Sequence, residues 1–123
     1  MNGLMTPVQL IHNPRCRKSR EALELLQGAG FQPEVRLYLE DPFNARELTT
    51  LISKLGISPA ELVRREEEVY KQLYKGKELS DREWIDAMVA HPKLIQRPIV
   101  MVGDRAVVGR PPELVLTLLK AGA

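Results

Sequence analysis

The chain has 123 residues, of which 44% are hydrophobic and 28% charged, with a net charge of +2. These values predict one globular domain over residues 1–123, and the charge is too small to indicate a nucleic-acid-binding protein. No apolar run approaches the roughly 20 residues that span a membrane, and the single cysteine and the lack of a signal-peptide pattern predict a cytoplasmic protein.

The first forty residues have the pattern of a βαβ unit. Residues 8–11 are apolar and predict a strand, and residues 21–27 predict an amphipathic helix. Apolar residues then alternate with polar ones over residues 34–40, which predicts a second strand with Val35, Leu37 and Leu39 on one face. Two strands joined by a helix in this way are expected to be parallel.

The middle of the chain is predicted to be helical. Three capping boxes begin at Asn44, Ser58 and Ser80, and each starts a run with helical apolar spacing. Gly56 is expected to end the first of these helices, and residues 66–74 continue the helical pattern more weakly. We interpret this block, about residues 42–92, as an insert in an α/β core.

The last third returns to β-structure and ends in a helix. Residues 99–102 and 106–108 flank Gly103-Asp104, which predicts a β-hairpin. Pro111-Pro112 is expected to start the final helix. The fold class is therefore α/β, with the order βαβ, helical insert, ββα.

Cys16 is the main candidate for chemistry because it is predicted to lie where a strand ends and a helix begins. Unpaired backbone N–H groups and the positive end of the helix dipole favour a thiolate there. Positive charge around it comes from Arg15, Arg17, Lys18 and Arg20. We therefore expect a reactive thiolate of low pKa. The alternative of a buried core cysteine is disfavoured by these charged neighbours.

Other candidate site residues have both a functional and a structural interpretation. His12 and Ser19 could stabilise the thiolate, or His12 could be a satisfied strand-end histidine and Ser19 a solvent-facing helix residue. Arg64, Arg97 and Arg110 could bind an oxyanion through their planar guanidinium groups, or form ordinary ion pairs. No metal site is predicted, because two histidines and one cysteine cannot form a credible zinc cluster.

Five separated motifs together carry a family resemblance. They are Ile11-His12-Asn13-Pro14-Arg15-Cys16-x-x-Ser19-Arg20, Tyr38-Leu39-Glu40, Leu62-Val63-Arg64, Leu94-Ile95-Gln96-Arg97-Pro98-Ile99-Val100 and Gly109-Arg110-Pro111-Pro112-Glu113. In this order they resemble the glutaredoxin-dependent arsenate reductase (ArsC) family. The resemblance implies a thioredoxin-like fold with a helical insert.

The resemblance also implies an activity and roles for particular residues. Cys16 would attack arsenate, glutathione would act as cosubstrate and bind the arsenic, and glutaredoxin would resolve the adduct and release arsenite. Three arginines would bind the anion, His12 and Ser19 would tune the thiolate, and Pro98 would be the cis-proline that faces the active cysteine in this fold. The anion-binding arginines would be Arg64, Arg97 and Arg110.

Two alternatives remain open. Arg17 and Lys18 stand where arsenate reductases often carry small residues, so the enzyme could be a glutathione-dependent thiol oxidoreductase with a substrate other than arsenate. The chain could also be a regulatory protein similar to the Spx transcription regulators, which bind RNA polymerase. Ser19 disfavours that alternative, because it replaces the second cysteine of their C-x-x-C switch.

Overall fold

The computed structural model describes residues 7–122, and their side chains as far as residue 119. The chain divides into two compact units. The first combines the N-terminal part, up to Asp41, with the part from Arg97 onwards, and the second is Pro42–Gln96. The helical segment predicted over residues 42–92 thus continues into a short extended stretch that belongs to the same unit.

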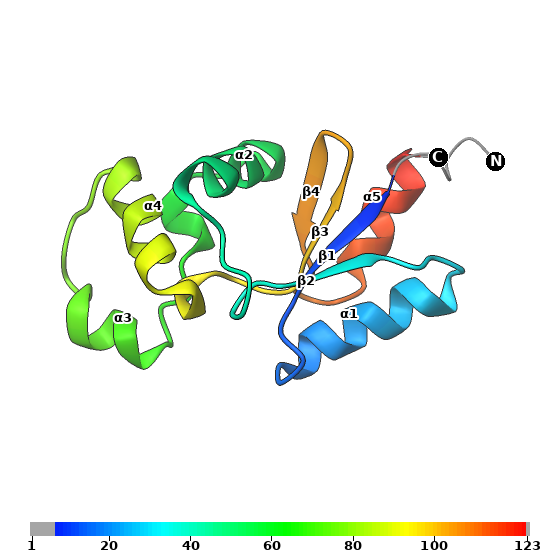
Figure 1. The fold of residues 1–123 in the computed structure, drawn as a ribbon, viewed down its shortest axis with the longest axis horizontal. Helices are drawn as coiled ribbons and strands as arrows, with labels where there is room; N and C mark the ends of the chain where they lie inside the picture. The colour runs from blue at the N-terminus through cyan, green and yellow to red at the C-terminus, as the bar shows by residue number, and fades with distance from the viewer. Residues whose placement is uncertain (1–6, 123) are drawn as a thin grey trace. The chain divides into compact units, whose positions relative to one another are not determined.

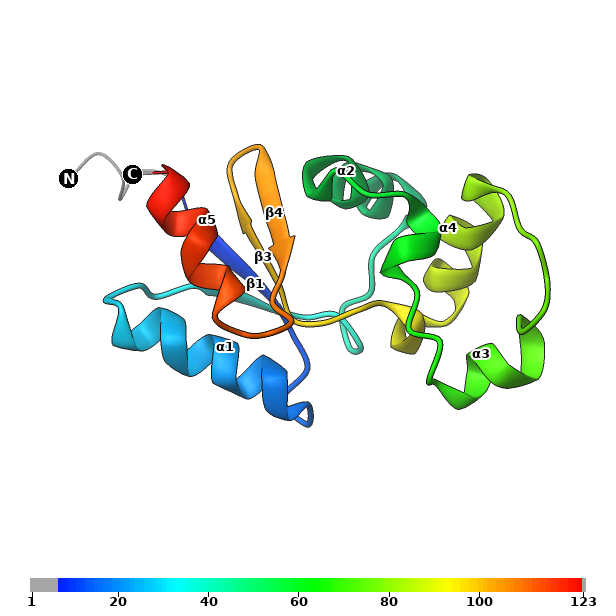
Figure 2. The same cartoon turned by 180° about the vertical axis from the view of Figure 1, so that it is seen from behind.

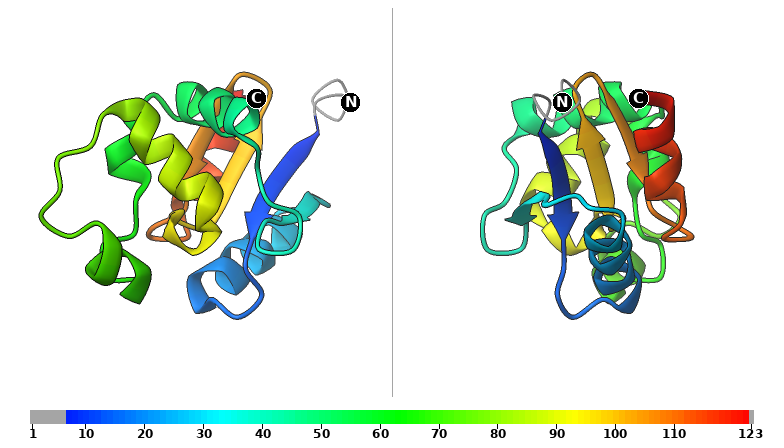
Figure 3. Two further views of the ribbon diagram at one scale, coloured as in Figure 1. Left: turned by 60° about the vertical axis from the view of Figure 1, so that its left-hand side comes forward. Right: turned by 90° about the vertical axis from the view of Figure 1, so that its right-hand side faces the viewer.

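A four-stranded mixed sheet forms the first unit. Its strands are β1 (Val8–His12), β2 (Glu34–Leu37), β3 (Ile99–Val102) and β4 (Arg105–Val108), in the order β2-β1-β3-β4. β1 is parallel to β2 and antiparallel to β3, as the βαβ pattern and the hairpin predict, and Figure 3 shows the hairpin of β3 and β4. With helices α1 (Arg17–Gly28) and α5 (Leu114–Gly122), this is the arrangement of a thioredoxin-like fold (Figure 1).

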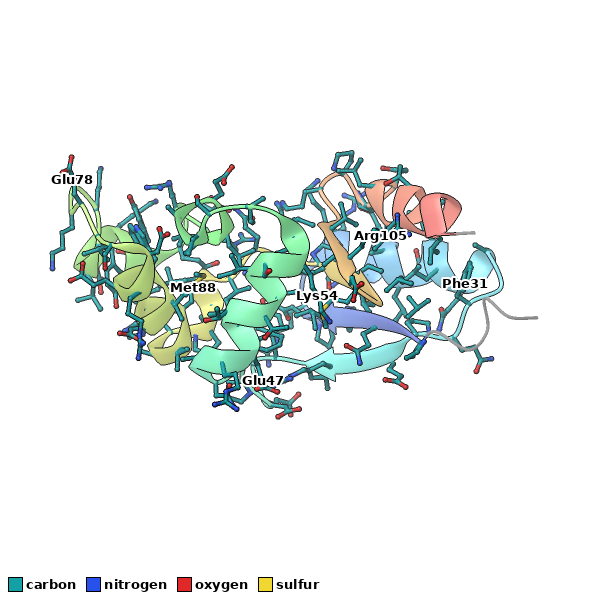
Figure 4. All side chains as sticks on the ribbon, turned by 90° about the horizontal axis from the view of Figure 1, so that it is seen from above. Phe31, Glu47, Lys54, Glu78, Met88 and Arg105 are labelled. Atoms are coloured by element: carbon teal, nitrogen blue, oxygen red, sulfur yellow. The ribbon has the colours of Figure 1, made fainter. Side chains whose placement is uncertain are left out.

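Helices α1 and α5 pack on the same face of the sheet (Figure 2). Alternate residues of β1 point to that face, as the pleat of a strand requires. The Arg105 side chain, labelled in Figure 4, also donates a hydrogen bond of 3.5 Å to the carbonyl of Leu118 in α5. The core between helices and sheet consists of Val8, Leu10, Ala22, Leu26, Val100, Val115 and Leu118.

Strand β2 is shorter than the sequence predicts. It ends at Leu37, because the N–H groups of Glu40 and Asp41 both donate to the Leu37 carbonyl and turn the chain. The predicted apolar face is therefore wrong: Tyr38 is fully buried, whereas Val35 and Leu39 are 45% and 37% exposed. Alternation fails beyond Leu37 because the pleat that produces it has ended.

The final helix begins later than expected. Residues 111–113 form a tight turn, in which Leu114 donates to the carbonyl of Pro111 and Val115 to that of Pro112. Since proline has no backbone N–H, these prolines can lead into a helix but cannot donate within it. Helix α5 therefore starts at Leu114.

The second unit is built from helices α2 (Ala45–Leu55), α3 (Glu68–Leu73) and α4 (Asp81–Ala90), with 3₁₀ turns at Pro59–Leu62 and Pro92–Leu94. All three predicted capping boxes are present, at Asn44, Ser58 and Ser80. Gly56 ends α2 with a left-handed φ of 69°. Met88 of α4, labelled in Figure 4, is fully buried among the side chains of this unit.

An aromatic cluster lies between α3 and α4 within the second unit. The rings of Tyr70 and Trp84 are stacked with centroids 6.3 Å apart, and both residues are buried, so these rings serve packing. The guanidinium of Arg65 lies 5.3 Å from the centre of the Tyr70 ring and donates a 2.6 Å hydrogen bond to the Tyr70 hydroxyl. In residues 7–122, none of the helices has the length and apolar character to cross a membrane.

Candidate active site

The loop between β1 and α1 (Figure 1) ends at Cys16, directly before the first residue of the helix. Cys16 is the N-cap of α1, with extended backbone angles, and its N–H donates to the carbonyl of Asn13 at 2.9 Å. The side-chain oxygen of Asn13 accepts from the N–H of Arg15 at 3.0 Å. The Arg20 guanidinium donates to the carbonyl of Pro14 at 2.9 Å. These contacts fix the turn, so the thiol has a defined place at the helix end.

The thiol of Cys16 is half-buried, and its pKa is lowered overall. Burial raises the pKa of the thiol. This effect is outweighed by hydrogen bonds from the N–H groups of Ser19 and Lys18 and from the Arg97 side chain, together with the charge of Arg97, all of which lower the pKa. The Cys16 side chain makes no side-chain capping hydrogen bond to the first turn of α1. These donors act on the charged sulfur, which is the nucleophilic form.

Ser19 is fully buried and links two neighbours of the loop. Its hydroxyl oxygen accepts from the N–H of Asn13 at 3.0 Å and lies 2.7 Å from Nδ1 of His12. The alternative interpretation of Ser19 as a solvent-facing helix residue is therefore wrong. The partners of the hydroxyl are His12 and Asn13, and the contribution of Ser19 to the thiolate comes through its backbone N–H.

His12, at the end of β1, is also buried, and its pKa is lowered. The main cause is burial, which penalises the charged ring, and the positive charge of Arg20 adds to it. The imidazole is therefore neutral at neutral pH. Of the two roles considered for His12, the structure favours a neutral hydrogen-bonding partner in the loop over a cation that pairs with the thiolate.

Arg97 and Arg110 lie in the same part of the first unit as Cys16. Arg97 acts on the sulfur directly, and one N–H of the Arg110 guanidinium donates to the carbonyl of Arg97 at 2.9 Å. The peptide bonds Arg97–Pro98 and Arg110–Pro111 are both cis. Binding of an oxyanion by these two arginines remains a prediction.

Arg64 belongs to the second unit. Its backbone N–H donates to the carbonyl of Leu94 at 2.6 Å, next to an antiparallel bridge between Val63 and Ile95. Its guanidinium forms ion pairs with Glu66 at 3.2 Å and Glu67 at 3.4 Å, and its side chain is 11% exposed. Its proposed part in anion binding remains a prediction.

Two residues with a clear place in this geometry had no role of their own in the sequence interpretation: Asn13 and Gly109. Asn13 carries a recognisable local signal, because asparagine side chains often accept from the N–H two residues later in a turn. Gly109 carries no comparable signal, since its contact with Pro98 depends on the folded chain. Arg20 was expected to add positive charge beside the thiol; in the structure it donates to the carbonyl of Pro14 and its charge lowers the pKa of His12.

The comparisons with known proteins agree with this fold. Residues 11–118 match the model of the ArsC family. An uncharacterised protein of Escherichia coli K12, YfgD, is 49% identical over 91% of this chain and 96% of its own. An arsenate reductase of Haemophilus influenzae is 45% identical over 91% of this chain and 98% of its own.

A solved structure extends the likeness to three dimensions. The arsenate reductase of Vibrio cholerae superposes with a TM-score of 0.87 and 46% identity, covering 91% of this chain and 97% of the other. The family match covers the loop, the helical insert and both arginine–proline steps, and relatives above 40% identity align over nearly their whole length. This protein therefore belongs to the ArsC family.

Proposed function

We propose that this protein is a cytoplasmic, thiol-dependent oxidoreductase that reduces arsenate to arsenite with glutathione and glutaredoxin. The observation that supports this most is the half-buried thiol of Cys16, which lies at a helix N-terminus beside the guanidinium of Arg97 and has a lowered pKa. Its relatives named arsenate reductases, at 45% and 46% identity, suggest the substrate.

The proposed reaction begins at the sulfur of Cys16. The thiolate attacks arsenic and forms a sulfur–arsenic bond, and one arsenate oxygen leaves as water. Glutathione displaces a second oxygen in the same way. A glutaredoxin thiol then attacks the glutathione sulfur and forms a disulfide, while the electron pair of the breaking sulfur–arsenic bond passes to arsenic. Arsenic falls from As(V) to As(III), and water releases arsenite from Cys16.

The surroundings of Cys16 support the first step. The Arg97 guanidinium can stabilise the thiolate and offer N–H donors to an arsenate oxygen, because arginine binds oxyanions through a planar fork. The N–H groups of Lys18 and Ser19 stabilise the same charge from the helix end. Arg110 would bind a second oxygen, with Arg64 as the third arginine of the predicted set.

The test is arsenate turnover with purified glutathione and glutaredoxin. We expect turnover only when both thiols are present, and none with Cys16→Ser, which replaces the nucleophilic sulfur by a weakly acidic hydroxyl of similar shape. Omission of glutaredoxin should leave arsenic bound to the enzyme, which mass spectrometry detects. Turnover by Cys16→Ser, or full turnover without glutaredoxin, contradicts the proposal.

A second candidate is a glutathione-dependent thiol oxidoreductase with another substrate. The observation that favours it is the exposed basic loop, in which Arg15, Arg17 and Lys18 flank the thiol; Arg17 also forms an exposed ion pair with Glu21, at 3.5 Å. These cations suit a larger anionic substrate such as a glutathionylated protein. Rapid release of glutathione from such a protein, without arsenate turnover when both thiols are supplied, selects this candidate.

A further inference from the structure

Gly109 lies directly after β4, at a point where a side chain has no room. A Cβ atom at this position would lie 2.9 Å from Cγ1 of Val115 and 3.1 Å from Cγ of Pro98. The first distance is shorter than real Cβ contacts, and the second is tighter than most of them. The φ angle of Gly109 is not left-handed. Glycine is therefore required here for space and not for backbone conformation.

Both neighbours of Gly109 are packed in the interior. Val115 is fully buried and belongs to the core between α5 and the sheet. The ring of Pro98 is also buried. Since protein interiors are close-packed, a methyl group added at this point must displace one of the two. The displaced group would be Pro98, because its segment lies outside a strand or helix, whereas Val115 is anchored by its helix.

Two hydrogen bonds join the same short segment to residues 97–98. The N–H of Gly109 donates to the carbonyl of Pro98 at 2.8 Å, and the guanidinium of Arg110 donates to the carbonyl of Arg97 at 2.9 Å. The end of β4 therefore holds residues 97–98 through both carbonyls and one close packing contact. Arg97 belongs to this segment, so the position of its side chain depends on these contacts.

We propose that Gly109 is a positioning residue for the nucleophile: its missing side chain lets Pro98 pack beside α5, and this holds the Arg97 guanidinium next to the sulfur of Cys16. The inference depends on the proposed function only in taking Cys16 as the reacting group. Arg97 is the charged side chain that acts on the sulfur; its other stabilising contacts are N–H groups of α1, at Lys18 and Ser19. The charge of Arg20 acts on His12, whose pKa it lowers.

The experiment measures the alkylation rate of Cys16 by iodoacetamide, a neutral reagent, as a function of pH. In Gly109→Ala, we expect the midpoint of this profile to move to higher pH. An adjacent opposite charge changes a pKa by about 1 or more, and the greater nucleophilicity of a thiolate of higher pKa offsets about half of the resulting loss of rate. Below the midpoint, the rate should therefore fall about threefold to tenfold. The rate on the alkaline plateau should not fall, because the sulfur is intact and its thiolate is at least as nucleophilic.

Gly28→Ala is the matched control, since a Cβ at Gly28 would have nothing within 4 Å and Gly28 lies in the same unit. Its profile should match the original. If Gly109→Ala is not recovered folded, Arg110→Gln provides the test, because it removes the hydrogen bond to Arg97 without adding an atom. At about 1 M salt, where charges are screened beyond about 3 Å, its shift should persist.

The outcomes separate this inference from the proposed function. A folded Gly109→Ala variant with the original pH profile overturns the positioning role, and so does a rate lowered equally at all pH values. For Arg110→Gln, a profile equal to the original at high salt has the same meaning. If the original protein itself has an ordinary thiol profile, the proposed thiolate chemistry fails, whatever the variants show.

Discussion

The buried hydroxyl of Ser19 allows a prediction with a magnitude. Ser19→Ala removes the acceptor of the Asn13 N–H and the partner of Nδ1 of His12, at 3.0 Å and 2.7 Å. Both groups lie in buried residues, 7% and 5% exposed, so water cannot easily replace the lost partner. An unsatisfied buried polar group costs about 1–3 kcal/mol.

For two such groups we expect Ser19→Ala to lower the free energy of unfolding by about 2–6 kcal/mol. Alanine is the better helix former and offsets about 0.5 kcal/mol of this. Domains of this size are typically stable by about 5–15 kcal/mol, so the variant should still fold. Urea unfolding followed by far-ultraviolet circular dichroism measures the difference.

Thr117→Ala provides the control for this measurement. The Thr117 hydroxyl also makes a hydrogen bond within its helix, to the Leu114 carbonyl at 2.6 Å, but it is exposed. Water replaces the lost partner there, so we expect a change within about 0.5 kcal/mol. If Ser19→Ala unfolds at the same urea concentration as Thr117→Ala, the reasoning that both groups depend on Ser19 is refuted.

Three further predictions concern charged residues. Arg97→Gln should raise the pKa of Cys16 and slow its alkylation at acidic pH; an unchanged pH profile contradicts the role of Arg97. His12→Gln should flatten the loss of stability on acidification, because burial lowers the pKa of His12 below its unfolded value of about 6.5, so its contribution is complete above that pH and is lost below it. Urea midpoints at several pH values check this, and an equally steep curve refutes it. Arg65→Ala should cost about 1–2 kcal/mol through its lost ring contacts and hydrogen bond, against under about 0.5 for Arg82→Ala, whose ion pair with Asp86 is exposed; equal unfolding midpoints contradict this.

The elements that the sequence predicted well are those defined by contacts between near neighbours. The capping boxes at Asn44, Ser58 and Ser80 join residues three apart, so the residue types in the sequence indicate where each helix begins. The hairpin at Gly103 depends on a turn of two residues. The place of Cys16 at a helix start was predictable for the same reason, since a strand pattern and a helix pattern bracket it.

Local patterns failed where a turn or a packed neighbour interrupts them. The alternation that placed Leu39 inside stops at Leu37, because two N–H groups converge on that carbonyl and turn the chain. Tyr38 is buried instead. The burial of Ser19 was missed although its spacing carries a signal, because Ser19 lies three residues before Ala22 and seven before Leu26, on the buried face of α1.

The amino-acid sequence by itself determined the succession of strands and helices along the chain, the starts of the capped helices and the place of Cys16 before α1, because hydrogen bonds between near neighbours and the hydrophobic period depend on local spacing. The tertiary structure alone decided which side chains surround the sulfur. Arg97 acts on Cys16, and Gly109 leaves room for Pro98, only because β3, β4 and α5 bring distant segments together. Such contacts arise from packing in three dimensions, and no local pattern encodes them.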